Sequence, residues 1–260
     1  MLTFQSGQLE TLLTQVFWPF VRIGACFMIA PVFSASYVPA RVRVLLAGAI
    51  ALLVAPLVPP PPGILPFSAS GVLVTIQQMI IGGALGFCMQ IIFDAVTLGG
   101  QLLANSMGLS FAYNIDPLHG AQTPALGTFY SLLVTMTFLA LNGHLVLLET
   151  VVDGFKTMPI GTSGLGNDGF WAVVTWGSQI FSGALAVSLP GVTALLIVNV
   201  AFGVMSRAAP TLNLFAVGFP VSLICGLGIA FVGLPSVQTT FVRLMEEAVL
   251  LVRGLTGLGA

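Results

Sequence analysis

Long uncharged stretches dominate the pattern of this chain. Asp, Glu, Lys and Arg are all absent from four of them, at residues 44–93, 117–148, 169–206 and 208–242. About 20 mostly apolar residues are enough for a helix to cross a bilayer, so each stretch can hold at least one such helix. A soluble protein can bury a single stretch of this kind as a core helix, but four of them indicate a protein that lies in a membrane.

Proline and glycine divide the apolar sequence into six predicted helical segments. These cover roughly residues 12–34, 42–58, 72–98, 125–148, 172–205 and 212–234. Prolines stand inside several segments, at Pro19, Pro31, Pro56, Pro190 and Pro220. Proline removes an intrahelical hydrogen bond, and the freed carbonyl then needs another partner in lipid. We therefore predict an all-α integral membrane protein of about six kinked hydrophobic helices in hairpins, within a single membrane domain over residues 1–260.

The C-terminal residues follow a different pattern. From Val237 onward, apolar or small residues recur at alternating steps of four and three, at Phe241, Leu244, Ala248, Leu251 and Leu255. This spacing predicts an amphipathic helix after the sixth segment. Its other faces carry charges of both signs, at Arg243, Glu246, Glu247 and Arg253. A mixed polar face favours packing on a partner over binding to a lipid surface.

Four positions are predicted to serve helix packing. Gly82 and Gly86 stand four residues apart in the third segment, and small residues at this spacing let helix backbones approach closely in a membrane. Pro190 and Pro220 mark interior breaks, at which a neighbouring helix is expected to lie.

Composition narrows the function classes. Hydrophobic residues make up 57% of the chain and charged residues only 6%, far fewer charges than a soluble domain carries. The net charge of −1 comes without a basic stripe, which argues against a nucleic-acid partner. The three cysteines lie in apolar runs, without metal-binding spacing. The chain shows no nucleophile elbow, phosphate-binding loop or metal-binding helix, so we expect neither an enzyme nor a cofactor or metal site.

The basic residues do not fix a membrane orientation. With six spans, Arg41, Arg43 and Arg207 fall on one side of the membrane. Lys156, Arg243 and Arg253 fall on the other side. The positive-inside rule therefore favours neither orientation.

Few polar side chains are candidates for chemistry. Asp94 lies near the end of the third segment, and a carboxylate inside a membrane is a functional hypothesis by default. An interfacial or locally paired carboxylate explains Asp94 equally simply. His119 and His144 have no carboxylate in sequence that is expected to complete a catalytic or metal-binding set with them, and an interfacial hydrogen bond accounts for His144. The remaining acidic residues near Lys156 (Glu149 and Asp153) indicate a charge cluster at a helix end.

The segment 105–123 is the most informative connection. It interleaves Met107, Leu109, Phe111 and Tyr113 with turn residues, between two apolar helices. A solvated loop has no need of regularly spaced large apolar side chains. Non-helical backbone at membrane depth must be buried in protein or line a cavity, and apolar constrictions can close a pore by excluding water. The pattern leaves two interpretations open, a seal and a loop that packs on its neighbouring helices.

Five segments resemble, in this order, motifs of the FliR family of flagellar type III export-gate subunits. They are QQMIIGGALGF (77–87), MGLSFA (107–112) with Asp116-Pro117, FLALNGH (138–144), Leu189-Pro190 and SRAAPTLNLFAVGFP (206–220). The match covers nearly the whole chain, and its last motif is the most specific. One departure is Gln78, since many members carry an acid there, which argues against an essential carboxylate at this position.

The resemblance implies a role in protein export. It implies a gate built with FliP-like and FliQ-like subunits in a helical ring, with a FlhB-like subunit nearby, through which unfolded flagellar substrates pass. It places the chain at the bacterial inner membrane, with membrane lipid among its partners. The assembly it implies lies largely above the ordinary membrane plane, within the ring of the flagellar basal body. It also implies a pore-closing loop that contains Met107, Leu109, Phe111, Tyr113, Asn114 and Asp116.

Three other functions stay open at this point. The first is the homologous gate of an injectisome, although the Asn-Gly-His and Arg-Ala-Ala-Pro motifs favour the flagellar branch. The second is a secondary transporter with a site around Asp94, for which we find no internal repeat. The third is a structural membrane scaffold without a pore.

Overall fold

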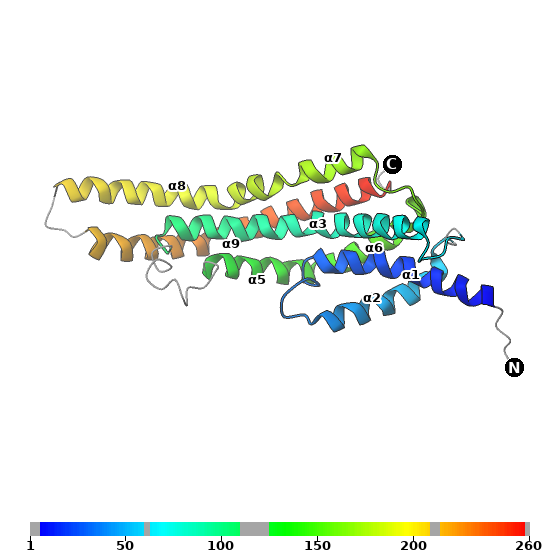
Figure 1. Ribbon diagram of the computed structural model, residues 1–260. Helices are drawn as coiled ribbons and strands as arrows, with labels where there is room; N and C mark the ends of the chain where they lie inside the picture. The colour runs from blue at the N-terminus through cyan, green and yellow to red at the C-terminus, as the bar shows by residue number, and fades with distance from the viewer. Residues whose placement is uncertain (1–5, 60–62, 110–124, 209–213, 258–260) are drawn as a thin grey trace. The chain divides into compact units, whose positions relative to one another are not determined.

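The computed structural model describes residues 6–59, 63–109, 125–208 and 214–257, and all regular structure within these ranges is helical. The predicted all-α class is therefore confirmed. The helices in chain order (Figure 1) are α1 (Ser6–Ile29), α2 (Ala40–Val54), the 3-10 helix η1 (Ala55–Leu57), α3 (Ala69–Ser106), α5 (Ala125–Ala140), α6 (Gly143–Thr157), α7 (Asn167–Trp176), α8 (Gln179–Ala208) and α9 (Leu214–Leu255).

Several helices are long and apolar enough to cross a membrane. Within the described residues there are four such stretches, Ala40–Leu57, Ala69–Ser106, Asn167–Ala208 and Gly218–Leu255. The bent pair α5 and α6 makes a fifth if it is counted as one span. The first predicted segment forms only a shorter apolar helix, Leu13–Ile29. These findings agree with a helical membrane protein, with fewer full-length spans than the six predicted segments.

The fourth predicted segment, 125–148, is broken in the structure, and no proline causes the break. α5 ends at Ala140 and α6 begins at Gly143. Between them Asn142 adopts the left-handed conformation, with φ 56°. Asparagine enters this region more readily than most residues with a side chain. Asn142 therefore ends one helix and starts the next.

Interior prolines behave differently from one helix to another. α1, α8 and α9 continue through Pro19, Pro190 and Pro220, respectively. Pro31 instead follows the end of α1, and Pro56 lies in η1. Proline thus marks helix ends at two of the five positions and lies inside a continuing helix at the other three.

The predicted C-terminal amphipathic helix exists as the continuation of the sixth segment, because α9 runs unbroken through Pro235. Its predicted apolar face is buried at Phe241, Leu244 and Ala248. The expectation that this face covers a partner is wrong at these positions, because the chain buries them itself.

The chain forms two compact units. Unit 1 comprises Met1–Ile91, Phe138–Gly177 and Glu246–Ala260, and unit 2 comprises Ile92–Thr137 and Ser178–Met245. The helices α3 and α9 each contribute residues to both units. The prediction of one membrane domain stays a prediction, since two such units can belong to one folding domain.

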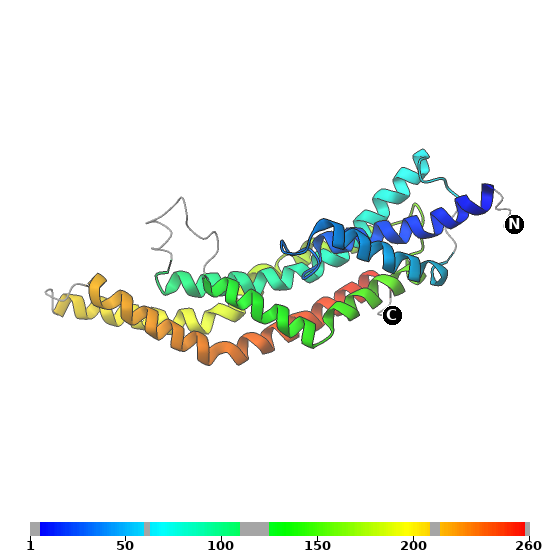
Figure 2. The same cartoon turned by 90° about the horizontal axis from the view of Figure 1, so that it is seen from below.

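Unit 1 has a core of large side chains. The helices α1 and α2 lie side by side in both views (Figure 1 and Figure 2). Between them the chain turns after Ala30, where Phe27 stacks on Phe33 with ring centroids 4.2 Å apart. The indole of Trp176 at the end of α7 donates a hydrogen bond to the carbonyl of Cys88 in α3 at 3.0 Å. The core cluster consists of Trp18, Val54, Val58, Val74, Phe155 and Ile160.

Unit 2 is held by contacts between α3, α5, α8 and α9. Phe93 of α3 meets Phe241 of α9 edge to face, with ring centroids 5.3 Å apart. Gly183 of α8 lies where a Cβ would be 3.0 Å from side-chain atoms of both Ala95 and Leu244. Small residues at such points let these helices approach closely.

Candidate functional site

The end of α3 fixes the start of the predicted pore-closing segment. The Leu109 amide donates to the carbonyl of Ala104 at 3.1 Å, and the Gly108 amide donates to the carbonyl of Asn105 at 3.0 Å. Gly108 has φ 82°, a conformation that glycine adopts without strain. These two bonds form a Schellman motif, which satisfies carbonyls that a helix end leaves unpaired. The motif explains why a glycine stands between two large apolar residues here.

Met107 packs inside unit 2. Its side chain is only 1% exposed. A Cβ on Gly226 of α9 would collide with the Met107 side chain, so the glycine leaves the room that Met107 occupies. The sequence left two interpretations open for this segment, a seal and a loop that packs on neighbouring helices. The position of Met107 alone agrees with the second interpretation.

Leu109 is half-buried and faces an apolar cavity. The cavity has a volume of about 380 Å³ and lies between the end of α3, α5 and α9. It is lined by Met107, Leu109, Ala125, Leu126, Phe129, Leu227, Ala230, Phe231 and Leu234. The segment that follows Leu109 therefore starts beside a water-excluding surface. The other predicted loop residues, Phe111, Tyr113, Asn114 and Asp116, lie outside the described residues.

Gly82 and Gly86 lie at the contact between α3 and α1 in unit 1. A Cβ on Gly82 would collide with the backbone carbonyl of Arg22. A Cβ on Gly86 would lie 2.7 Å from the carbonyl oxygen of Cys26 and 3.0 Å from the amide nitrogen of Ala30. Backbone atoms cannot move aside as a side chain can, so this interface requires glycine at both positions.

Arg22 is a buried cation that the sequence interpretation missed. It is 0% exposed in α1. Its Nε donates to Oε1 of Gln78 at 2.7 Å, and its Nη2 donates to the carbonyl of Met158 at 2.9 Å. Its Cζ also lies 4.0 Å from the ring centroid of Phe155, within cation–π range. The guanidinium therefore joins α1, α3 and the end of α6.

The Arg22 cluster is only partly satisfied. Within the described part of the chain, Arg22 makes no ion pair with a carboxylate, and its Nη1 has no hydrogen-bond partner. The Nε2 of Gln78 is likewise buried without a partner. Burying a charge is costly unless it is paired. The available signal was the position of Arg22, since it is the only charged residue between Glu10 and Arg41.

The remaining predicted residues do not converge on one place. Pro190 and Pro220 are exposed within the chain, and Pro190 borders a second cavity in unit 2. Asp94 lies on an exposed face of α3. Lys156 donates to Asp153 at 2.7 Å, which confirms a local charge cluster at the end of α6. No group of three or more His, Cys, Asp or Glu suited to a metal ion occurs among the residues that the structure describes.

The described residues thus form apolar surfaces and helix contacts. Comparison with known proteins shows which family has this sequence. Residues 13–248 match the family described as "Bacterial export proteins, family 1". A "Flagellar biosynthetic protein FliR" from Pectobacterium carotovorum is 40% identical over 227 residues, which is 87% of each chain. The protein of the same name from Escherichia coli is 38% identical over 95% of this chain and 94% of its own. The Bacillus subtilis protein of that name is 28% identical over 90% and 93%, respectively.

Proposed function

We propose that this chain, which belongs to family 1 of the bacterial export proteins and within it to the FliR proteins of flagellar biosynthesis, is a subunit of the flagellar type III export gate. It would assemble with FliP-like and FliQ-like subunits, next to a FlhB-like one, in the inner membrane at the flagellar basal body. The observation that carries the proposal is the match at 38% identity over 95% of the chain to a flagellar FliR protein.

Apolar surface on unit 2 supports assembly with other subunits. On α8, Ile197, Val200 and Val204 are each more than half exposed. On α9, Phe231 and Val232 are more than three-quarters exposed. Contiguous exposed apolar surface of this kind marks a contact with lipid or with another protein. Since helices in membranes associate through close packing, both kinds of neighbour are compatible with these faces.

Co-expression tests the partners. The full chain is produced in mild detergent with and without FliP-like and FliQ-like subunits. We expect a stable complex with them and an aggregating chain without them, because the faces of α8 and α9 would lack their cover. A monodisperse, heat-stable monomer obtained without partners would contradict assembly as the condition for stability.

The segment after α3 is proposed to help close the gate. Two observations support this proposal. Met107 and the Schellman motif fix the first residues of the segment, and an apolar cavity lies beside Leu109. By sequence the segment continues with Phe111 and Tyr113, whose apolar bulk suits a constriction that excludes water.

Polar substitution of the segment tests closure. Because Met107 is a packing residue, the change is confined to Phe111→Ser with Tyr113→Ser, or to deletion of residues 110–115. We expect intact complexes and cells that leak small ions or dyes, since a wetted constriction no longer excludes water. The matched control is Phe67→Ser, because Phe67 is 98% exposed in unit 1.

Two outcomes would contradict closure. Intact complexes with unchanged membrane permeability would show that the segment does not seal the pore, whatever happens to motility. Failed assembly of the double variant, with normal assembly of Phe67→Ser, would show that the segment braces helices instead.

A further inference from the structure

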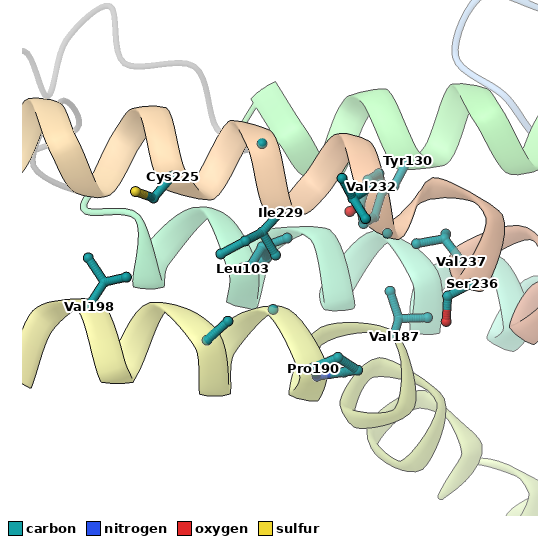
Figure 3. Close-up of a pocket in the computed structure, with 14 residues that line it drawn as sticks. Leu103, Tyr130, Val187, Pro190, Val198, Cys225, Ile229, Val232, Ser236 and Val237 are labelled. Atoms are coloured by element: carbon teal, nitrogen blue, oxygen red, sulfur yellow. The ribbon is translucent and has the colours of Figure 1, made fainter.

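The interiors of the two units differ in polarity. In unit 2, the second cavity, between α8 and α9, is lined mainly by apolar side chains such as Leu103 and Val187 (Figure 3). In unit 1, the core that contains Trp18 and Phe155 also encloses the cation of Arg22. A buried charge is costly unless it is paired, so the interior of unit 1 is where a polar ligand would have a role.

The described chain satisfies only part of the Arg22 guanidinium. This group carries five N–H donors in one plane. Nε donates to Oε1 of Gln78, and Nη2 donates to the carbonyl of Met158. Cζ lies over the ring of Phe155, a contact that stabilises the charge but offers no lone pair to an N–H group. Nη1 has no hydrogen-bond partner within the described residues, so its hydrogens need an acceptor from elsewhere.

Two further buried donors without a partner lie beside Arg22. One is Nε2 of Gln78, in the same amide group whose Oε1 accepts from Arg22. The other is Nε1 of Trp18, four residues before Arg22 in α1 and therefore on the same face of the helix. All three side chains are 0% exposed. Because buried polar atoms are nearly always hydrogen-bonded, three unpaired donors in one cluster indicate an acceptor that the described chain does not supply.

The charge of the cluster selects the class of acceptor. Within the described residues Arg22 makes no ion pair. Asp153, the acidic residue nearest to Met158 in sequence, is bonded to Lys156 instead. The cluster therefore combines one uncompensated positive charge with unpaired donors. Water would accept from these donors without neutralising the charge, whereas a monovalent anion does both, and burial favours the neutralised pair.

The surroundings restrict the anion to a small one. The three donor side chains are fully buried among the large apolar residues of the unit 1 core. Phosphate and sulfate are larger and carry more charge than one guanidinium balances. The bond from Nη2 of Arg22 to the Met158 carbonyl is only partly buried. The loop 158–166, which follows α6, is therefore the side on which the cluster lies nearest to the surface and from which an ion would enter.

We propose that unit 1 binds one small monovalent anion, of the size of chloride, at Nη1 of Arg22. Nε2 of Gln78 and Nε1 of Trp18 are its further donors. The bound anion completes the polar contact that joins α1, α3 and the end of α6, and so it stabilises unit 1. This site is independent of the proposed export function, because it depends only on contacts within unit 1.

Replacement of chloride tests the site. The full chain, with the subunits that co-purify, is kept in mild detergent at constant ionic strength while sodium gluconate is exchanged for sodium chloride. Gluconate is too large for a fully buried cluster, so only chloride should stabilise the folded protein by binding to it. We expect the midpoint of thermal unfolding to rise by about 2–4 °C and to level off at high chloride concentration.

Three variants locate the effect. Arg22→Met removes the charge, so the midpoint should no longer depend on chloride. Gln78→Glu supplies a carboxylate from the chain itself, so this variant should assemble and also lose the dependence on chloride. It covers the case in which Arg22→Met fails to fold. Arg41→Met removes a charge of the same kind on the exposed surface of α2 and should keep the full shift.

Tryptophan fluorescence shows whether the anion lies in the cluster. Bromide can replace chloride in such a site, and it quenches an indole that it contacts. Trp18 is 0% exposed, so bromide in solution does not reach it, whereas Trp171 is 69% exposed and is quenched in proportion to bromide concentration. We expect the unchanged protein to show an additional quenching component that saturates. Gln78→Glu retains every tryptophan and should lose this component.

Three results would overturn the proposal. One is a midpoint that does not change with chloride, which would mean that a neutral acceptor such as water pairs with the donors. Another is a shift of undiminished size in Arg22→Met or Gln78→Glu, or its loss in Arg41→Met, since the effect would then arise elsewhere. The third is quenching by bromide without a saturable component that Gln78→Glu removes. None of these results bears on export, because neither assembly nor motility is the quantity measured.

Discussion

The helices α3 and α8 are similarly apolar but have very different surroundings. Each is long and apolar and carries a single charged residue, Asp94 in α3 and Arg207 in α8. In the most apolar part of α3, 61% of the residues are buried within the chain. In the corresponding part of the α7–α8 stretch, Asn167–Ala208, only 17% are buried. Hydropathy therefore identifies an apolar helix but does not show whether the rest of the chain or another neighbour covers it.

Glycine contacts distinguish the two helices better than hydropathy does. In α3, an added Cβ at Gly82 or Gly86 would strike the backbone of α1, and one at Gly100 would lie 2.9 Å from Gly127 of α5. In α8, Gly203 has open space around it. α3 is thus enclosed by its own chain, and much of α8 is left for lipid or other subunits.

The largest effect is expected from filling the contact between α3 and α1. Gly82→Leu places a side chain against the carbonyl of Arg22, which cannot move aside. We expect a loss of more than about 3 kcal/mol in unfolding free energy from this overpacking. The measurement is the yield and thermal unfolding of the purified complex in detergent. Gly203→Leu makes the same change in α8 and should behave as the unchanged protein. Equal losses for both variants would mean that α8 is as enclosed as α3.

The second-largest effect is expected at Arg22, whose hydrogen bonds join α1 to α3 and to the end of α6 in unit 1. Arg22→Met leaves the buried Gln78 Oε1 and the partly buried Met158 carbonyl without their donor. Two unsatisfied acceptors, one of them fully buried, are expected to cost about 2–4 kcal/mol. The control is Arg41→Met on the exposed surface of α2. A surface change of this kind should alter stability by less than ~0.5 kcal/mol. Thermal unfolding that is the same for both variants would show that the buried cation does not support the fold.

Much of the fold could be predicted from the sequence. The uncharged stretches located the apolar helices, and the steps of three and four located the buried face of α9. Helix ends were harder to predict. The sixth predicted segment ended at residue 234, yet α9 continues through Pro235, which is exposed and so leaves room for its ring. The helix break at Asn142 could not be predicted from a proline, because none stands there.

Less of the candidate site could be predicted. The sequence motif indicated Met107 and Leu109, and the Schellman motif at Gly108 gives the physical reason for their spacing. The Arg22 cluster was not predicted, because its partners Gln78 and Met158 stand 56 and 136 residues away in the chain. A pairing at such a distance has no local pattern. The cavity beside Leu109 likewise depends on how helices meet, which single-helix periodicity does not determine.

A gain in stability is expected where the Arg22 cluster is incomplete. Gln78→Glu replaces the unpartnered Nε2 with a carboxylate oxygen beside a guanidinium that is already buried. The new charge partner should add ~1 kcal/mol or more to the unfolding free energy, because hydrogen bonds between charged groups are the stronger ones. The same change at the neighbouring Gln77 should lower the unfolding free energy, because its Oε1 is buried without a partner and its side chain makes no bond to Arg22 in the described structure. The measurement is the midpoint of thermal unfolding in detergent. A lower midpoint for Gln78→Glu than for Gln77→Glu would contradict this account.

The smallest effect is expected at the only charge on α3. Asp94 lies on an exposed face of the helix, so Asp94→Asn keeps the shape of the side chain and removes a charge at the surface of unit 2. Surface changes of this kind typically alter stability by no more than about 0.5 kcal/mol. We expect complex assembly to be unchanged and motility to fall less than about twofold, with recovery when the variant is expressed at a higher level. A transporter with its site at Asp94 requires the opposite, because a proton or cation site needs the charge. Complete loss of motility in Asp94→Asn cells that contain fully assembled complexes would therefore favour the transporter over the export gate.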